Sequence, residues 1–391
     1  MISTARPLPF RLVHEPVAAV VAAAGVVVAL VWWLWGWPLG LDSAVYRSGA
    51  LAVLNGQDLY GRLAATPDWS PDLPFAYPPT AALVFLPLAV LPTQLVWGVM
   101  AVSTVAGLVV VVRLVRDRSP AVAYPSGFLL LLPALEPVWR TIGFGQINVL
   151  LMALVVVDVL ALRGSRFCGV LVGVAAAIKL TPLIFVLHLV VTRRRGDALR
   201  ALGTFAGLGC VAFVLLPGDT VRYWSGAVLG ANGAMSNVWS GNQSLSGLVR
   251  RLAGPSPAAT LVLALLAVTC VVVAALLARA AEDRGNSVEA MLVTAFCGLL
   301  VSPISWTHHW VWVAPLCVLM RKRFVPVVVP VVAAFSGWTF WLVPQGDHRE
   351  LAWTPLESLV GNAYVLSALV AGAALAVHLV RTGRKPPLHH V

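Results

Sequence analysis

Long apolar stretches recur along the whole chain, separated by short polar segments. Many approach the roughly 20 residues that a helix needs to cross a bilayer. They lack the short alternating segments that are typical of outer-membrane barrels. The pattern therefore predicts an all-α, polytopic membrane protein with about twelve transmembrane helices, one pair being a hairpin of two short helices. The predicted segments are Val17–Leu39, Gln94–Leu114, Ala121–Val138, Gln146–Leu162, the hairpin Phe167–Ile178 and Pro182–Thr192, Leu199–Leu216, Ala259–Leu277, Val288–Ser302, Trp310–Met320, Phe324–Val343 and Leu359–Val380.

Two polar stretches stand out as outer loops of a single domain that spans residues 1–391. The first covers residues 40–93 and the second residues 217–258. Pro78–Pro92 in the first loop is apolar, but it is broken by Pro87 and at about 15 residues is short for a span. We expect it to form a helix that lies in the membrane interface.

Composition agrees with a membrane protein. Hydrophobic types make up 59% of the chain and charged types 11%, which excludes a soluble globular enzyme. The five cysteines lie in or beside apolar runs, so we expect no disulfide. Walker A, GxSxG and dinucleotide fingerprints do not occur, and no cofactor is expected. HExxH and Asp-x-Asp patterns are missing too, so no metal is expected.

The net charge of +11 comes from basic loops. With Pro78–Pro92 in the interface, every predicted inner loop is basic and most of the 27 lysines and arginines lie inside. This predicts a multi-pass plasma-membrane protein with both termini in the cytoplasm. The charge is accounted for by the membrane, so we expect membrane lipids and no nucleic acid as partners. The sequence gives no signal for an oligomeric state.

Acidic, amide and histidine residues gather on the predicted outer face, which places the chemistry there. Asp42 directly follows the first predicted span. It is a candidate general base for an attacking hydroxyl. The alternative is an N-cap for a helix over Ser43–Leu54, because aspartate is a favoured cap.

Positive and imidazole groups supply candidates for binding phosphate. Lys179 interrupts an apolar stretch just before Thr181-Pro182, where it is costly unless it reaches water or an anion. The alternative is a side chain that extends to the interface from a helix end. His308 and His309 are adjacent, so they point to different sides of a helix and are poor joint metal ligands. Each could bind a phosphate or a sugar hydroxyl, or tie two helix ends together.

Amide and guanidinium groups form two further clusters that suit sugar hydroxyls or phosphate oxygens. Arg140, Gln146 and Asn148 flank Gly143-Phe144-Gly145. Asn242 and Gln243 form the second cluster, in the second outer loop. Loop structure is the alternative for both clusters.

Six motifs together resemble the actinobacterial polyprenyl-phosphate-mannose-dependent α-(1,2)-mannosyltransferases of glycosyltransferase family 87. They occur in order along almost the whole chain. The motifs are Leu41-Asp42-Ser43-Ala44-Val45-Tyr46, Phe75-Ala76-Tyr77-Pro78-Pro79, Gly145-Gln146-Ile147-Asn148, Ala177-Ile178-Lys179-Leu180-Thr181-Pro182, Asn242-Gln243-Ser244-Leu245, and Ser302-Pro303-Ile304-Ser305-Trp306 through His308-His309-Trp310.

The resemblance implies a GT-C membrane fold and an inverting transfer. The donor would be a polyprenyl-phosphate-mannose and the acceptor a hydroxyl of a phosphatidylinositol mannoside, lipomannan or lipoarabinomannan. Asp42 would be the base, with no metal required. Residues assigned to the donor phosphate or sugar are Lys179, His308, His309 and Arg140, and those assigned to the acceptor sugar are Gln146, Asn148, Asn242, Gln243 and Tyr77.

Three alternatives remain at this point. A polyprenyl-phosphate arabinofuranosyltransferase would use the same chemistry with another sugar. A lipid-linked sugar flippase would place charged groups at mid-membrane and would need no acidic base. A non-catalytic partner in a cell-wall complex would tolerate replacement of the outer polar residues.

Overall fold

The computed structural model describes residues 39–119, 132, 134–228, 238–319 and 325–383. These residues are helical and contain no β-strand; an isolated bridge pairs Asn242 with Trp306. The α-helices are α2 (Leu41–Leu54), α3 (Pro79–Phe85), α4 (Thr93–Asp117), α5 (Glu136–Phe144), α6 (Asn148–Val156), α7 (Val170–Ile178), α8 (Ile184–Val191), α9 (Arg195–Leu215), α10 (Pro217–Arg222), α12 (Leu245–Ala253), α13 (Pro257–Glu282), α14 (Ser287–Val301), α15 (Val313–Val318), α16 (Val325–Ser336), α17 (Pro355–Gly361) and α18 (Ala363–Gly383). The short 3₁₀ or π turns are η1 (Leu86–Leu88), η3 (Val157–Ala161), η4 (Thr181–Leu183), η5 (Tyr223–Ala227), η7 (Thr307–Trp312), η9 (Thr339–Trp341) and η10 (Arg349–Ala352).

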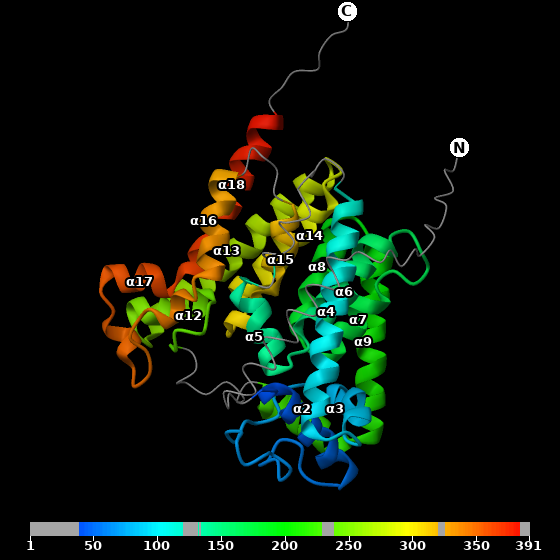
Figure 1. Ribbon diagram of the computed structural model, residues 1–391. Helices are drawn as coiled ribbons and strands as arrows, with labels where there is room; N and C mark the ends of the chain where they lie inside the picture. The colour runs from blue at the N-terminus through cyan, green and yellow to red at the C-terminus, as the bar shows by residue number, and fades with distance from the viewer. Residues whose placement is uncertain (1–38, 120–131, 133, 229–237, 320–324, 384–391) are drawn as a thin grey trace, which may run out of the picture.

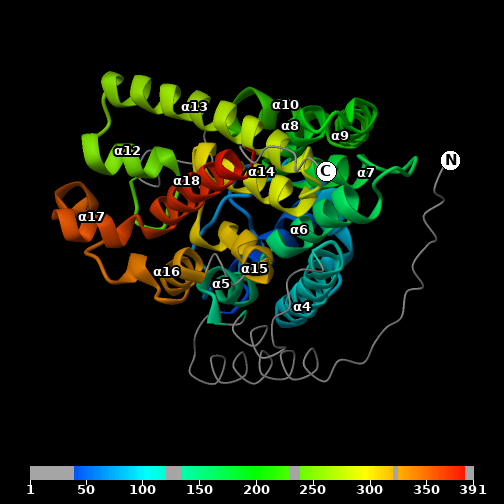
Figure 2. The ribbon, with the colours of Figure 1, turned by 90° about the horizontal axis from the view of Figure 1, so that it is seen from above.

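Four helices among these residues, α4, α9, α13 and α18, are long and apolar enough to cross a membrane. They confirm the helices predicted over Gln94–Leu114, Leu199–Leu216, Ala259–Leu277 and Leu359–Val380. Figure 2 shows α4 and α13 at opposite edges of the molecule, with shorter helices between them. Most residues in the apolar stretches of α9, α13 and α18 are not buried against the rest of the described protein, as expected for helices that face lipid.

Between the long helices the chain departs from simple spans. The segment predicted as the span Gln146–Leu162 forms α6 and η3. It is long enough to cross a membrane only together with α5, and the two parts are bent by 115° relative to each other. The break lies at Gly145, whose φ of 65° favours glycine. The described residues thus give four candidate spans, or five with the bent pair. The total of about twelve crossings stays a prediction.

Short apolar helices account for other predicted segments. The hairpin is confirmed: α7 ends at Ile178 and η4 begins at Thr181, with Lys179 between them. Val288–Ser302 forms α14, which at 15 residues is short for a span. Val17–Leu39 lies outside the described residues except for its last position, as does most of Ala121–Val138. The described residues of Trp310–Met320 form the end of η7 and α15, and those of Phe324–Val343 form α16 and η9, so neither predicted span is one long helix.

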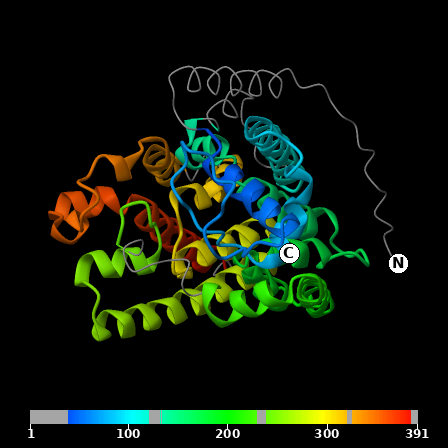
Figure 3. The same ribbon diagram turned by 90° about the horizontal axis from the view of Figure 1, so that it is seen from below.

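One end of the bundle, which we call the site end, is formed by α2 and α3 (Figure 3). The predicted interfacial segment Pro78–Pro92 contains the short helix α3 and the turn η1, and Pro87 lies where the first helix gives way to the turn. Tyr46 of α2 stacks on Phe85 of α3 with ring centroids 4.4 Å apart. The packing of these rings fixes α2 against the bundle.

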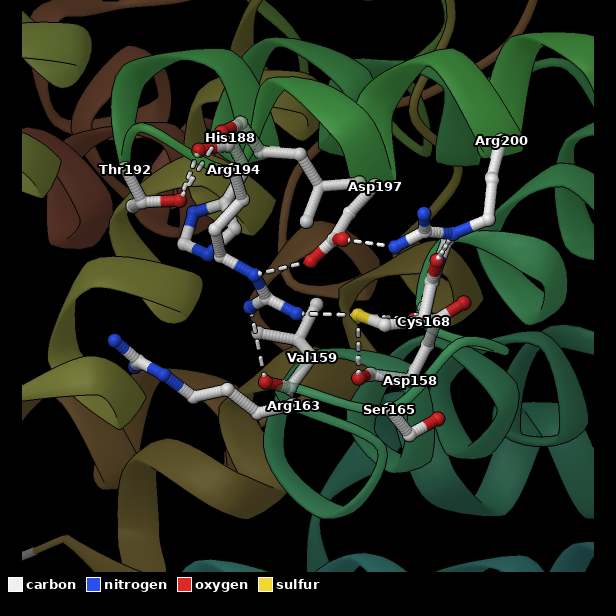
Figure 4. Close-up of polar contacts among 12 residues, drawn as sticks. Asp158, Val159, Arg163, Ser165, Cys168, His188, Thr192, Arg194, Asp197 and Arg200 are labelled. Atoms are coloured by element: carbon white, nitrogen blue, oxygen red, sulfur yellow. Dashed lines mark hydrogen bonds and ion pairs between the residues drawn. The ribbon is translucent and has the colours of Figure 1, made fainter. Parts of the chain in front are cut away.

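At the other end of the bundle, which we call the basic end, arginine side chains form hydrogen bonds between neighbouring elements. Figure 4 shows Arg194 at the start of α9 bonded to Asp197, to the Val159 carbonyl and to the Cys168 thiol. Asp158 accepts hydrogen bonds from the N–H groups of Gly169 and Val172 at 2.6 and 2.8 Å, so it caps the start of α7. All five cysteines are free, as predicted.

Candidate active site

Asp42 lies in the first turn of α2, at the site end. The N-cap of this helix is Gly40, in the left-handed region, and no side chain caps it. The interpretation of Asp42 as the N-cap is therefore wrong, because the helix begins two residues earlier than expected. Ser43 instead bonds back to the Gly40 carbonyl at 3.0 Å. The Asp42 side chain remains partly exposed, so a substrate can reach it.

The surroundings of Asp42 tune its carboxyl. Burial raises the pKa of Asp42 from 3.8 to about 6, because a charged carboxylate loses hydration there. A hydrogen bond from Gln146 and the charges of Lys179 and Arg140 act in the opposite direction. A base whose pKa is near 6 is ionised at neutral pH and still able to take a proton.

Gln146 is the centre of a polar cluster that packs against α2. Its Oε1 accepts a hydrogen bond from the Tyr46 hydroxyl at 2.8 Å, and Tyr77 lies 3.5 Å from the same oxygen. Its Nε2 lies 3.4 Å from Nε2 of His308. The chain reverses at Gly145, and this turn is what points the Gln146 side chain towards α2.

Lys179 reaches the cluster from the break between α7 and η4. Its Nζ donates to Oδ1 of Asn148 at 2.9 Å, lies 3.2 Å from Nε2 of His309 and sits over the Tyr77 ring. Burial lowers the pKa of Lys179 from 10.5 to about 8, while the Asp42 carboxylate acts in the opposite direction. The helix break that the sequence indicated thus delivers an ammonium group beside Asp42.

The two histidines point in different directions, as predicted from their adjacency. Their rings are nearly perpendicular, with centroids 4.7 Å apart, and His308 faces Gln146 while His309 faces Lys179. Burial and nearby cations hold the pKa of both imidazoles well below the usual range, so both are neutral. The His308 carbonyl accepts from Asn148 at 3.0 Å, which fixes this turn against α6.

Arg140 approaches from α5, six residues before Gln146. Its Nε lies 3.4 Å from Oε1 of Glu136. Its guanidinium sits over the rings of Phe144, Phe340 and Trp341. Arg140 and Lys179 therefore reach Asp42 from separate elements, α5 and the α7–η4 break.

Asn242 and Gln243 lie outside this cluster and are fully buried. Asn242 bonds to the Pro303 carbonyl and the Ser305 N–H, at 3.2 and 3.0 Å. Gln243 donates to the Ser240 and Gly361 carbonyls. Asn242 therefore anchors the backbone that leads to His308, and Gln243 anchors the backbone at Ser240 and Gly361.

Sequence analysis missed two buried residues of the cluster. Tyr46 is fully buried and bonds to Gln146; it is one turn after Asp42, so helical spacing could have indicated it. Glu136 is also fully buried. As an acid near the end of an apolar stretch it could have been noticed as a costly group that needs partners.

An apolar groove with a volume of about 460 Å³ reaches Pro78 before α3 and Ala177 near the end of α7. It is formed by residues of α3, α7, α9, α10 and η5. Pro78 and Ala177 connect it to the cluster, being next to Tyr77 and two residues before Lys179. Phe205, Gly209, Cys210, Phe213 and Trp224 are among its other lining residues.

Comparison with known proteins decides the family. A profile of glycosyltransferase family 87 matches residues 75–303, more than half of the chain. The chain belongs to glycosyltransferase family 87. The matched region includes Tyr77, Arg140, Gln146, Asn148 and Lys179. No solved structure matches the chain.

Curated relatives of this family 87 glycosyltransferase extend beyond the matched region. A Mycolicibacterium smegmatis protein named polyprenol-phosphate-mannose-dependent alpha-(1-2)-phosphatidylinositol mannoside mannosyltransferase is 34% identical over 372 residues, which cover 85% of this chain and 84% of the relative. A Mycobacterium tuberculosis protein named as the corresponding phosphatidylinositol pentamannoside mannosyltransferase is 36% identical and covers 85% of this chain and 81% of its own. A second M. tuberculosis protein, with the same name as the first relative, is 32% identical over 91% of this chain and 90% of its own.

The arrangement suits glycosyl transfer by a family 87 enzyme. A carboxylate that can take a proton lies beside an ammonium group and two neutral imidazoles. Among the described residues, no group of three or more His, Cys, Asp or Glu side chains is placed to hold a metal ion.

Proposed function

We propose that this glycosyltransferase moves mannose from a polyprenyl-phosphate-mannose donor to a hydroxyl of a phosphatidylinositol mannoside, lipomannan or lipoarabinomannan, forming an α-(1,2) bond. The names of the curated relatives support the donor, the phosphatidylinositol mannoside class of acceptor and the linkage. The observation that carries the proposal is the polar cluster at the site end. Tyr46, one turn after Asp42 on α2, bonds to Gln146, and Tyr77 of the same cluster lies against the Lys179 ammonium. The cluster thus brings a base and a cation to one site.

In the proposed reaction, Asp42 takes the proton from the acceptor hydroxyl as its oxygen attacks C1 of mannose. The bond between C1 and the phosphate oxygen breaks, and the electron pair leaves with the polyprenyl phosphate. Lys179 and His309 stabilise the charge that develops on the phosphate. A β-linked donor attacked from the opposite face gives an α product. A lipid phosphate is a fair leaving group, so the reaction needs neither a strong general acid nor a cofactor or metal.

The apolar groove that reaches Pro78 and Ala177 suits the polyprenyl chain of the donor. A chain lying against Phe205, Gly209 and Phe213 of α9 would place its phosphate near Lys179. Cys210 in this groove is exposed, so a thiol reagent can report its occupancy. We expect the polyprenyl-phosphate donor to slow alkylation of Cys210, and soluble mannose 1-phosphate to leave the rate unchanged.

We further propose a GT-C fold with about twelve crossings, with both termini in the cytoplasm and the site end outside. The substrates of such an enzyme are carried in the outer leaflet of the plasma membrane, and nucleic acid has no part in the reaction. The clustering of basic residues at the end opposite Asp42 supports this orientation.

The first test is Asp42→Asn in purified protein supplied with radiolabelled polyprenyl-phosphate-mannose and a phosphatidylinositol mannoside. We expect transfer to fall by at least about a thousandfold with an unchanged protein yield, because the amide cannot take the proton. Asp72→Asn is the control, since this exposed carboxylate pairs only with Arg62 among the described residues. Full activity of Asp42→Asn would refute the assignment.

The second test concerns Lys179. We expect Lys179→Ala to weaken use of the donor more than use of the acceptor, and Lys179→Arg to restore part of the activity by returning the positive charge. An unchanged donor KM and kcat in Lys179→Ala would rule out the phosphate role. Transfer of arabinose from arabinosyl polyprenyl phosphate, in place of mannose, would support the arabinosyltransferase alternative. Movement of the donor across the membrane without bond formation would indicate a flippase.

A further inference from the structure

The two cations near Asp42 have different surroundings. Lys179 contacts the Asn148 amide, the neutral His309 and the Tyr77 ring, and among the described residues it forms no ion pair with a carboxylate. Its positive charge is therefore available to a phosphate. Arg140 lies 3.4 Å from the Glu136 carboxylate, and the two charges offset one another. The Arg140 side is thus less suited to an anion than the Lys179 side.

Glu136 is held rigidly in the core. Its Oε1 accepts a hydrogen bond from the Thr307 hydroxyl at 2.8 Å, and its Oε2 accepts one from Tyr364 at 2.7 Å. The side chain is fully buried. Partners on η7 and α18 therefore fix the carboxylate, and the carboxylate in turn fixes the guanidinium of Arg140.

Aromatic rings surround that guanidinium. Its central carbon lies 4.8, 5.1 and 5.8 Å from the ring centroids of Phe144, Phe340 and Trp341. Phe340 is buried, whereas Trp341 is 52% exposed. Apart from the ion pair with Glu136, the described residues give Arg140 no hydrogen bond, and its Nε is a buried donor without a hydrogen-bond acceptor. The result is an exposed aromatic face beside an unpaired donor.

We propose that Arg140, Phe144 and Trp341 form the subsite for the acceptor, where they bind a pyranose ring, and that Glu136 is the positioning residue for Arg140. This inference rests on the proposed function. It places Arg140 on the acceptor side, in contrast to the expectation from sequence that it binds the donor phosphate.

The chemistry of a pyranose matches this subsite. A sugar ring has a face of C–H groups that packs on an aromatic ring, and hydroxyls at its edge that accept hydrogen bonds from a guanidinium. The subsite also adjoins the polar cluster around Gln146, because the Phe144 ring lies 5.5 Å from the His308 ring. An acceptor held there would present a hydroxyl to Asp42 while the donor phosphate lies at Lys179.

Steady-state kinetics with both substrates varied provide the test. We expect Trp341→Ala to raise the KM for a phosphatidylinositol mannoside about three- to tenfold, the effect of losing one stacking contact, and to leave the donor KM unchanged. Trp341→Phe should restore most of the affinity. Trp69→Ala is the matched control, because Trp69 is also exposed but lies in the first outer loop. An unchanged acceptor KM in Trp341→Ala, or a change confined to the donor KM, would overturn the proposal.

A double-mutant cycle tests the positioning role of Glu136. We expect Glu136→Gln and Arg140→Gln each to raise the acceptor KM, and the double variant to be no worse than Arg140→Gln alone, because both changes remove the same contact. Additive effects, or a loss of kcat with the acceptor KM unchanged, would show that Glu136 has only a structural role. If Glu136→Gln does not fold, the variants of exposed Trp341 still decide the subsite.

Direct binding separates this proposal from the proposed function. The quenching of tryptophan fluorescence by a phosphatidylinositol mannoside can be followed without turnover. If the wild-type protein transferred no mannose from polyprenyl-phosphate-mannose, the proposed function would be refuted. Weaker binding of the phosphatidylinositol mannoside to Trp341→Ala than to the wild type would still support the acceptor subsite. Equal binding to the wild type and to Trp341→Ala would refute the subsite even in an active enzyme.

Discussion

At the scale of single residues, Asp42 and Lys179 form the part of the site whose charges set its chemistry. Burial disfavours the charged form of each side chain, so it raises the pKa of Asp42 and lowers the pKa of Lys179. Each group nevertheless favours the charge of the other. Neutral partners, Gln146 and Asn148, hold the two side chains without cancelling either charge.

The pH dependence of kcat/KM follows from these two groups. Asp42 has to be ionised to act as a base, so activity should rise as the pH passes its pKa of about 6. Lys179 has to be protonated to attract the phosphate, so activity should fall as the pH passes its pKa of about 8. We expect a bell-shaped profile with limbs near these values, measured by initial rates in detergent. In Lys179→Arg the alkaline limb should move upward by more than one pH unit, and an unmoved limb would assign it to another group.

At the scale of elements, the turn at Gly145 sets the position of Gln146 relative to α2. A Cβ at residue 145 would lie 2.6 Å from Oγ of Ser43, and the φ of 65° already disfavours a side chain. Close packing of α2 on the end of α5 is therefore possible only with glycine here.

We expect Gly145→Ala to destabilise the protein by about 2 kcal/mol and to lower kcat, because α2 and its Asp42 must shift. Thermal unfolding in detergent and initial rates measure the two effects. Gly56→Ala is the control: its φ is 62°, but no heavy atom lies within 4 Å of the added Cβ. It should cost about 1 kcal/mol and leave kcat unchanged. Equal kinetics for the two variants would contradict this account.

The start of α7 depends on Asp158, which the structure places at the basic end, away from the site. Its carboxylate satisfies the N–H groups of Gly169 and Val172, which otherwise have no helical partner (Figure 4). The cap supports the short helix that ends at Lys179.

Removing this cap should affect stability rather than catalysis. We expect Asp158→Ala to lower the free energy of unfolding by about 1–3 kcal/mol, since two buried N–H groups lose their acceptor. The KM for both substrates should stay at the wild-type value in the folded fraction. Asp283→Ala, which removes an exposed ion pair with Arg279, should cost less than about 1 kcal/mol. A changed donor KM in Asp158→Ala would contradict a purely structural role.

At the scale of the whole molecule, charge divides the bundle into two ends. At the basic end, Arg163 pairs with Glu282, Arg279 donates to the Val191 carbonyl and Arg284 to that of Leu379. These bonds join the ends of η3, α8, α13 and α18. The site end is formed by α2, which contains Asp42, and by the segment that joins α2 to α3 (Figure 1).

The positive-inside rule predicts that the basic end faces the cytoplasm. In intact cells, a membrane-impermeant maleimide should label Gln57→Cys in the first outer loop. It should label Arg195→Cys at the start of α9 only after permeabilisation. Both positions are exposed on the protein surface, so a difference in labelling would come from the membrane and not from burial in the protein. The reverse result would place Asp42 in the cytoplasm and exclude an outer-leaflet donor.

Much of this organisation can be predicted from sequence because its causes are local. Runs of apolar residues determine α4, α9, α13 and α18, and Thr181-Pro182 ends α7 next to Lys179. Asp42, Lys179 and the histidines were identified because a polar residue beside an apolar run is costly without a role. Helix α5 was missed, because the sequence analysis ended one predicted span at Val138 and began the next at Gln146, which left Arg140 in a loop.

The sequence by itself determined the family, the apolar helices and the polar residues that merit attention. Only the tertiary structure decided which of those residues meet. Tyr46 bonds to Gln146 across 100 positions, and Glu136 bonds to Thr307 and Tyr364 across 171 and 228. Such contacts depend on how distant helices pack, and a periodic pattern within one helix carries no information about its partner. For the same reason Asn242 and Gln243, which look like sugar ligands in sequence, anchor a buried backbone, while the buried Glu136 holds Arg140 beside the base.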